Sequence, residues 1–178
     1  MTKPRPDMSP RQLLTVPSTK TLADYTCPML LAPSLRGQNA AAVIHELSYL
    51  LYRAGFVPDV LPFYRAALDR ERAGSTATSD GWAWPRAVAR DLAQPCFALG
   101  RCLAPVAWAQ GLKPFVHHVF LLAVPKDYAD NDCALEAGLT RLNTDQSLRT
   151  RLSTARDCGE MFDVLSQINL SALVDDAA

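Results

Sequence analysis

The 178-residue sequence lacks an excess of either charge. Lysine and arginine together number 18, and aspartate and glutamate also number 18, so the formal net charge is zero. Proteins that bind DNA, RNA or an anionic membrane surface usually carry a basic excess or a basic stripe. The charge balance therefore predicts that neither nucleic acid nor a membrane surface is a partner of this chain.

Long apolar runs are also missing. The longest strongly hydrophobic stretch, Val119–Val124, is far shorter than the ~20 residues that a membrane-spanning helix needs. Residues 1–20 contain no apolar segment of signal-peptide length and carry four prolines. We expect no insertion into a membrane and no export signal. We also expect a flexible proline-rich arm over 1–20, a domain over 21–170 and a solvated tail over 171–178.

Closely spaced cysteine pairs are the third absence. The chain has five cysteines, an odd number, and no two of them have the C-x-x-C spacing. Without an export signal, this usage is typical of reduced thiols in a cytosolic protein. A structural zinc site usually takes its ligands from close pairs. We therefore expect five free thiols in a cytoplasmic protein, with no bound metal and no cofactor.

The composition that remains is that of a folded domain, with 49% hydrophobic and 20% charged residues. Apolar residues between 40 and 54 recur with helical spacing, and Asn39 and Gly55 supply capping signals at the two ends. A second helix is expected from Pro58 to about Arg72. The sequence therefore predicts two consecutive helices between residue 40 and about residue 72.

Short segments that favour β-structure alternate with helical ones. We expect strands at Met29–Ala32, Trp82–Trp84, Cys96–Arg101 and Phe115–Val124. Three more helices are expected over about 132–142, 145–155 and 159–168, with Gly159 separating the last two. Strands interleaved with helices predict an α/β domain.

A polar loop over 74–81 joins the second helix to the first of the short central strands. Backbone N–H groups and hydroxyls in such a loop can hold a phosphate or another anion. Arg70, just before the loop, could add a charge-assisted hydrogen bond. Clusters of Gly, Ser and Thr are also common in ordinary connecting loops. The composition of the loop leaves both interpretations open.

Several segments, taken in order, resemble a known family. They are Leu68-Asp-Arg-Glu-Arg72, Gly74-Ser-Thr76, Gly81-Trp-Ala-Trp-Pro85, Ala98-Leu-Gly-Arg101, Val119-Phe-Leu-Leu-Ala-Val-Pro125, Arg141-Leu-Asn-Thr-Asp145 and Glu160–Leu165. From residue 26 to 170 the chain resembles the type-2 IIA domain of the bacterial sugar phosphotransferase system, which includes mannitol, fructose and nitrogen-related IIA proteins. The resemblance implies a single α/β domain with a mixed central β-sheet flanked by helices.

The resemblance also implies a chemistry. Members of the family accept a phosphoryl group on one histidine from the histidine phosphocarrier protein and pass it to a cysteine of a IIB domain. An imidazole suits this role because its ring nitrogen is nucleophilic at neutral pH. In the family the accepting histidine directly follows the proline of the short strand, whereas here Arg86 follows Pro85. A guanidinium is always protonated and has no free lone pair to attack phosphorus.

The other family positions are partly kept. Arg70 matches the phosphate-stabilising arginine, and Ser75 and Thr76 match the pocket loop. A second family histidine, which supports the phosphohistidine, aligns with Asp132. Since the two family histidines approach one another, we expect Arg86 and Asp132 to form an ion pair across the pocket.

These departures predict a IIA-like protein that is not an enzyme but a regulatory or interaction module. It would dock the histidine phosphocarrier protein, a IIB domain or a regulatory target. One alternative is an active phosphoryl carrier that uses another residue. His117 and His118 are the candidates, of which at most one can face inward because successive strand residues face opposite sides. The other alternative is a small-anion sensor in which Arg70 and Arg86 grip a phosphate or a carboxylate.

Overall fold

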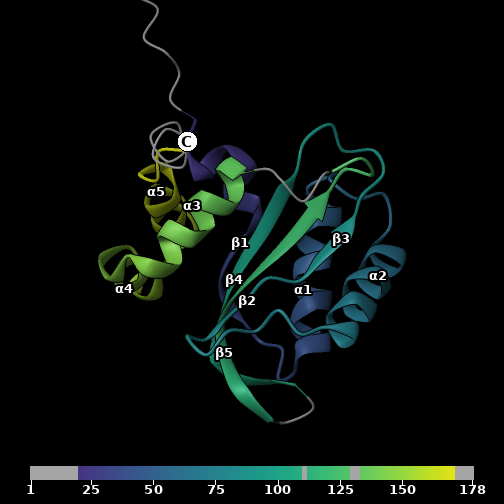
Figure 1. Ribbon diagram of the computed structural model, residues 1–178, viewed down its shortest axis with the longest axis horizontal. Coiled ribbons are helices and arrows are strands. Elements are labelled where there is room, and N and C mark those ends of the chain that lie inside the picture. The colour runs from purple at the N-terminus through teal and green to yellow at the C-terminus, as the bar shows by residue number, and fades with distance from the viewer. Residues whose placement is uncertain (1–19, 110–111, 129–132, 171–178) are drawn as a thin grey trace, which may run out of the picture.

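The computed structural model describes residues 20–109, 112–128 and 133–170 (Figure 1). For residues 112, 113 and 133 only the backbone is described. The expected tail over 171–178 lies outside these ranges, as do Asp132 and all of the expected arm except Lys20. Within the described residues, no helix combines the length and the apolar character needed to cross a bilayer.

One mixed β-sheet forms the centre of the described structure. Its five described strands are β1 (Leu31–Leu35), β2 (Trp82–Ala83), β3 (Arg86–Val88), β4 (Cys96–Ala109) and β5 (Leu112–Val124). The order is β1-β4-β5-β2, and β3 also pairs with β5. Only β4 and β5 are antiparallel among the described pairs. The mixed sheet confirms the predicted α/β fold class.

Helices cover both faces of this sheet (Figure 1). On one face lie α1 (Ala40–Arg53) and α2 (Val60–Ala73); on the other lie α3 (Cys133–Thr144), α4 (Gln146–Thr154) and α5 (Cys158–Ser166). Two 3₁₀ helices, Leu22–Tyr25 and Pro28–Leu30, precede β1. The result is a three-layer arrangement of helices, sheet and helices.

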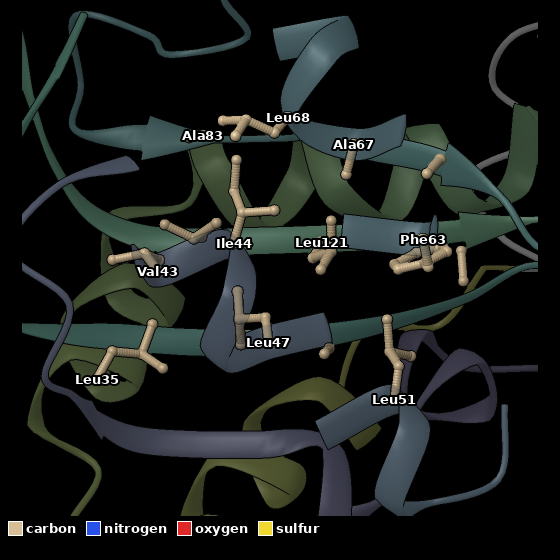
Figure 2. Close-up of a cluster of buried hydrophobic side chains, with 14 of the residues drawn as sticks. Leu35, Val43, Ile44, Leu47, Leu51, Phe63, Ala67, Leu68, Ala83 and Leu121 are labelled. Atoms are coloured by element: carbon tan, nitrogen blue, oxygen red, sulfur yellow. The ribbon is translucent and has the colours of Figure 1, made fainter. Parts of the chain in front are cut away.

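The alternation of side chains along the strands produces two hydrophobic cores. Leu121 of β5 points to the α1–α2 side, where Ile44 and Leu47 of α1 are fully buried (Figure 2). Phe120, its neighbour in sequence, belongs to the core under α3–α5 together with Trp82. Because β5 contributes to both cores, its long apolar run fits a central strand.

The capping signals of α1 are confirmed. The Asn39 side chain accepts a hydrogen bond from the Ala42 N–H at 2.9 Å, and Gly55 has a φ of +81° beyond the end of the helix. The second helix begins later than Pro58, because the Asp59 carboxylate caps it by accepting from the Leu61 N–H at 3.0 Å. Local hydrogen bonds therefore fix both helix starts.

Other predicted boundaries are wrong. Gly159 does not separate two helices: it lies inside α5, which is capped by Asp157 accepting from the Glu160 N–H at 2.9 Å. β1 begins at Leu31 rather than Met29 because Pro28–Leu30 forms a 3₁₀ helix. β4 extends far beyond the predicted end at Arg101, since its outer half pairs with the start of β5. β3 is an additional short strand that the sequence did not indicate.

Four cysteines have a described side chain, Cys27, Cys96, Cys102 and Cys158, and all four are free thiols. Burial raises the pKa of the Cys96 thiol to about 12, with a contribution from Cys27. It raises the pKa of Cys102 to about 11, with a contribution from Glu46. Both core thiols are therefore protonated at neutral pH and poor nucleophiles.

Candidate functional site

A cavity of about 690 Å³ lies between the end of α2, the β2–β3 connection and α3. We call it the arginine cavity, because Arg70 and Arg86 both line it. Arg70 belongs to the last turn of α2 and is exposed, whereas Arg86 is the first residue of β3 and is half-buried. Two guanidinium groups on one cavity favour an oxyanion, since their N–H groups match its charge and geometry.

A smaller cavity of about 150 Å³ is also lined by Arg70 and Arg86. Lys126, just beyond the end of β5, adds an exposed cation to its lining. The edge strand β3 holds Arg86 in place, since Arg86 pairs with Leu122 and the Pro85 carbonyl accepts from the Leu122 N–H at 2.9 Å. Three basic side chains therefore line the smaller cavity, beside β3 and the end of β5.

A polar stripe on α3 forms the opposite wall of the arginine cavity. Glu136, Thr140 and Asn143 all line it, and their spacing places them on one face of the helix. The Asn143 Oδ1 atom is buried and has no hydrogen-bond partner among the described residues. The cavity thus offers hydroxyl, amide and carboxylate groups opposite its two arginines. This stripe is not among the predicted site residues, although the helical spacing of its three members within the predicted helix is a signal for it.

The loop after α2 is built around the carboxylate of Glu71, which is only 7% exposed. This carboxylate accepts hydrogen bonds from the Thr76 N–H at 2.6 Å and the Thr76 hydroxyl at 2.7 Å. It also accepts from the Ser75 hydroxyl at 3.1 Å and from the Trp108 Nε1–H at 2.7 Å. The donors of the loop are therefore occupied by the Glu71 carboxylate, an anion that belongs to the chain itself. Sequence analysis did not identify Glu71 as the anchor of the loop.

The same network extends to the strand that carries Arg86. The Thr76 hydroxyl oxygen accepts a hydrogen bond from the Trp84 N–H at 2.9 Å. The Trp84 ring stacks on Phe120 with the ring centroids 4.5 Å apart. Pro85 and Arg86 follow Trp84 directly, so the contacts of Thr76 and Phe120 position the start of β3.

The predicted site residues are only partly brought together. Arg70, Thr76 and Arg86 line the arginine cavity. Ser75 lines a separate cavity of about 700 Å³ beside Trp108, with its hydroxyl donated to Glu71. Asp132 lies outside the described residues, and so does its predicted ion pair with Arg86. Glu136, four residues further along the chain, is a carboxylate that lines the arginine cavity.

The two strand histidines lie elsewhere. His118 is 5% exposed and stacks on Trp82, with the ring centroids 4.8 Å apart, whereas His117 is exposed. Burial, as the largest cause, and the charges of Arg101, His117 and Arg149 together lower the pKa of His118 from 6.5 to about 4. Both histidines line a third cavity, and neither lines the arginine cavity.

The sequence of this chain is similar to those of known proteins. Residues 30–168 match the family "Phosphoenolpyruvate-dependent sugar phosphotransferase system, EIIA 2". The chain is 30% identical over 152 residues to the PTS system fructose-specific EIIABC component of Bacillus subtilis (strain 168). That alignment covers 84% of this chain and 23% of the relative, so the chain spans about a quarter of the relative's length.

Solved structures share the fold. The nitrogen regulatory protein IIA-Ntr of Neisseria meningitidis superimposes with a TM-score of 0.66 and 24% identity, covering 81% of this chain and 98% of that one. The IIA mannitol enzyme of Escherichia coli, in a complex with phosphorylated IIB mannitol enzyme, gives a TM-score of 0.65 and 17% identity. It covers 79% of this chain and 96% of that one.

Proposed function

The chain belongs to the type-2 IIA family of the phosphoenolpyruvate-dependent sugar phosphotransferase system, and we propose that it is a non-catalytic regulatory or interaction module within that family. The observation that carries the proposal is Arg86. It lines the arginine cavity with Arg70, at the position that the family resemblance gives to the phosphoryl-accepting histidine. A guanidinium there can bind an oxyanion but cannot become phosphorylated by attack on phosphorus.

The surroundings of Arg86 support the proposal. No imidazole and no thiol is among the described residues that line the arginine cavity. His117 and His118 line another cavity, and His45 is exposed on α1, where its ring contacts Tyr64 with the centroids 5.2 Å apart. A phosphoryl group delivered to the arginine cavity would therefore meet cations but no nitrogen or sulfur nucleophile on a described residue.

A permanent cation at position 86 has a consequence for partners. A phosphorylatable histidine changes its charge with phosphorylation, whereas Arg86 keeps one charge at every physiological pH. Docking of a IIB domain, the histidine phosphocarrier protein or a regulatory target would then not depend on the phosphorylation state of this chain. The pairing of the E. coli mannitol IIA relative with phosphorylated IIB makes a IIB domain a reasonable candidate partner. Arg70, Arg86 and Lys126 could provide charge-assisted hydrogen bonds to a partner's phosphoryl group.

A phosphorylation assay tests the proposal. The chain is incubated with phosphoenolpyruvate, the first enzyme of the system and the histidine phosphocarrier protein, and its intact mass is measured. We expect no phosphate-sized increment, while an active type-2 IIA domain in the same mixture is phosphorylated. The R86H variant is expected to fall far short of that relative, because the second family histidine is also absent from the sequence. An acid-labile increment on the wild-type chain would contradict the proposal.

A small-anion sensor is the second candidate, favoured by Arg70 and Arg86 on one cavity. Inorganic phosphate or a sugar phosphate at millimolar concentration is then expected to raise the Tm of the protein, because a ligand that binds only the folded state stabilises it. The R70Q variant is expected to show a smaller rise, as Arg70 is exposed and can be replaced without loss of packing. A flat Tm, or equal rises in the two proteins, would exclude the sensor.

A further inference from the structure

A separate cavity of about 260 Å³ lies where α4 meets β2, β4 and β5. We propose that it binds a small oxyanion of the size of inorganic phosphate. The residues that carry the argument are Trp82, Arg101, His117, His118, Arg149 and Ser153. It shares no lining residue with the arginine cavity, so the inference does not rest on the proposed function.

The two cavities are separated along the sheet. Trp82 pairs with His118 on β5, and Arg86 pairs with Leu122 four residues further on. Four residues of strand correspond to about 13 Å at ~3.3 Å per residue. An anion held near His118 would therefore not contact Arg86, and the two sites can be tested separately.

The positive charge of the cavity comes from two guanidinium groups whose hydrogen bonds to described residues all go to backbone carbonyls. Arg101 donates from Nε to the Pro33 carbonyl at 3.0 Å and from Nη1 to the Ser153 carbonyl. Within the described parts of the chain, it forms no ion pair with a carboxylate. A carbonyl accepts a hydrogen bond but does not neutralise a full charge, so Arg101 retains its attraction for an anion.

Arg149 has the same kind of environment. Its Nη1 donates to the Asn143 carbonyl at 3.3 Å, and its Nη2 donates to the Asp80 carbonyl at 3.2 Å. The guanidinium also lies over the Trp82 ring, 5.8 Å from the centroid. A guanidinium carries more N–H donors than two carbonyls occupy, so both arginines keep donors for a ligand. Because the contacts already fix both side chains, binding would cost little further side-chain entropy.

The two histidines add to this donor set. The buried His118 has an Nε2 atom without any hydrogen-bond partner among the described residues, a state that normally costs free energy. Its low pKa keeps the ring neutral at neutral pH, so it carries one N–H donor. With the proton on Nε2, a ligand oxygen in the cavity would supply the acceptor that this atom lacks. His117, which is exposed, lies at the same cavity and could provide a second donor.

The volume of the cavity and the charge of its lining limit the size and the charge of the ligand that it can bind. Asp80 is the only acidic residue that lines the cavity, and it is exposed, so the described lining is net positive. The volume is below the ~300–1,000 Å³ of typical pockets for drug-sized molecules. A tetrahedral oxyanion fits both limits, because it is small and accepts hydrogen bonds on every side.

Ring resonances of the three histidines provide a direct test. The protein is titrated with inorganic phosphate at constant ionic strength and neutral pH, and the histidine ring signals are followed by NMR. The ring signals of His117 and His118 are expected to shift saturably with phosphate concentration. The ring signal of His45 on α1 is expected not to shift and serves as an internal reference. R149Q is expected to weaken phosphate binding about tenfold or more. R149K, which keeps the charge without the planar fork, is expected to weaken it less.

R70Q serves as the matched control, since Arg70 lines the arginine cavity and the smaller cavity beside it but not the cavity around His118. It is expected to leave the His117 and His118 titration unchanged. S153D places a carboxylate at an exposed position of the cavity and is expected to abolish binding, which keeps the test decisive if R149Q does not fold. The absence of a saturable shift in the wild-type protein would overturn the proposal. So would equal binding by wild type, R149Q and S153D, because the shifts would then arise elsewhere on the surface.

Discussion

Replacement of Glu71 with alanine is expected to lower the free energy of unfolding by about 3 kcal/mol, as measured by urea denaturation. The carboxylate is buried and accepts hydrogen bonds from the Thr76 N–H and the Trp108 Nε1–H. Both donors would lose their partner, and each unsatisfied buried donor costs about 1–3 kcal/mol. Water entering from the neighbouring cavity beside Trp108 would offset part of this loss.

Two further variants isolate the cause. Glu46 on α1 is half-buried and accepts one described hydrogen bond, from the Arg36 N–H at 3.0 Å, so E46A is expected to cost only about 1 kcal/mol. W108F removes one of the donors to Glu71. The effects of E71A and W108F are expected to be less than additive in the double variant, because both remove the same hydrogen bond. An E71A loss no larger than that of E46A would show that the loop does not depend on this carboxylate.

The H118F variant is expected to resist acid better than the wild-type protein. The folded state holds the pKa of His118 at about 4, below the ordinary value of 6.5, through burial and the charges of Arg101, His117 and Arg149. Above pH 6.5 both states are unprotonated at this residue, so the shift has no effect. As the pH falls from 6.5 towards 4, the unfolded chain takes up a proton that the folded protein does not, and stability decreases. Below 4 the loss levels off.

The full loss from this one group is about 3 kcal/mol. Phenylalanine can keep the stacking on Trp82 but cannot titrate, so this part of the pH dependence should disappear. The free energy of unfolding is measured at both ends of the pH range in phosphate-free buffer, with H45F as control. His45 is exposed, and H45F is expected to follow the wild-type pH profile. Parallel profiles for wild type and H118F would refute the expected contribution.

The sequence predicted best those features that depend on neighbouring residues. The helix after Asn39 has its cap and its apolar period within one segment, and the apolar run of β5 is likewise local. β3 has no local signal, because this three-residue strand is stabilised by pairing with the end of β5, whose paired residues lie 36 positions further along the chain (Arg86 with Leu122, 122 − 86 = 36). Gly159 does not interrupt the helices as its residue type predicts, because the Asp157 side chain caps α5 two residues before it.

The candidate sites also contain some residues that the sequence predicts and others that depend on contacts between distant segments. Arg70, Thr76 and Arg86 could be placed together because the family resemblance supplies the spatial relation that spacing alone does not. The role of Glu71 depends on Trp108, which reaches it from β4, and no local pattern brings these two residues together. The cavity around His118 needs Arg149 from α4 and Arg101 from β4. Contacts between such distant segments are set by tertiary packing.

The two edges of the sheet limit how another chain can attach to it. β1 forms one edge and contains Pro33; β2 and β3 form the other and are separated by Trp84 and Pro85. Proline has no N–H to donate to an added strand, and edge strands of two and three residues offer few hydrogen bonds. Neither β1 nor the pair β2 and β3 is therefore a template for continuous β-pairing with a second copy or with an extended peptide. A partner that binds at β1 or at β2 and β3 therefore has to recognise side chains, which makes its specificity there a matter of charge and shape.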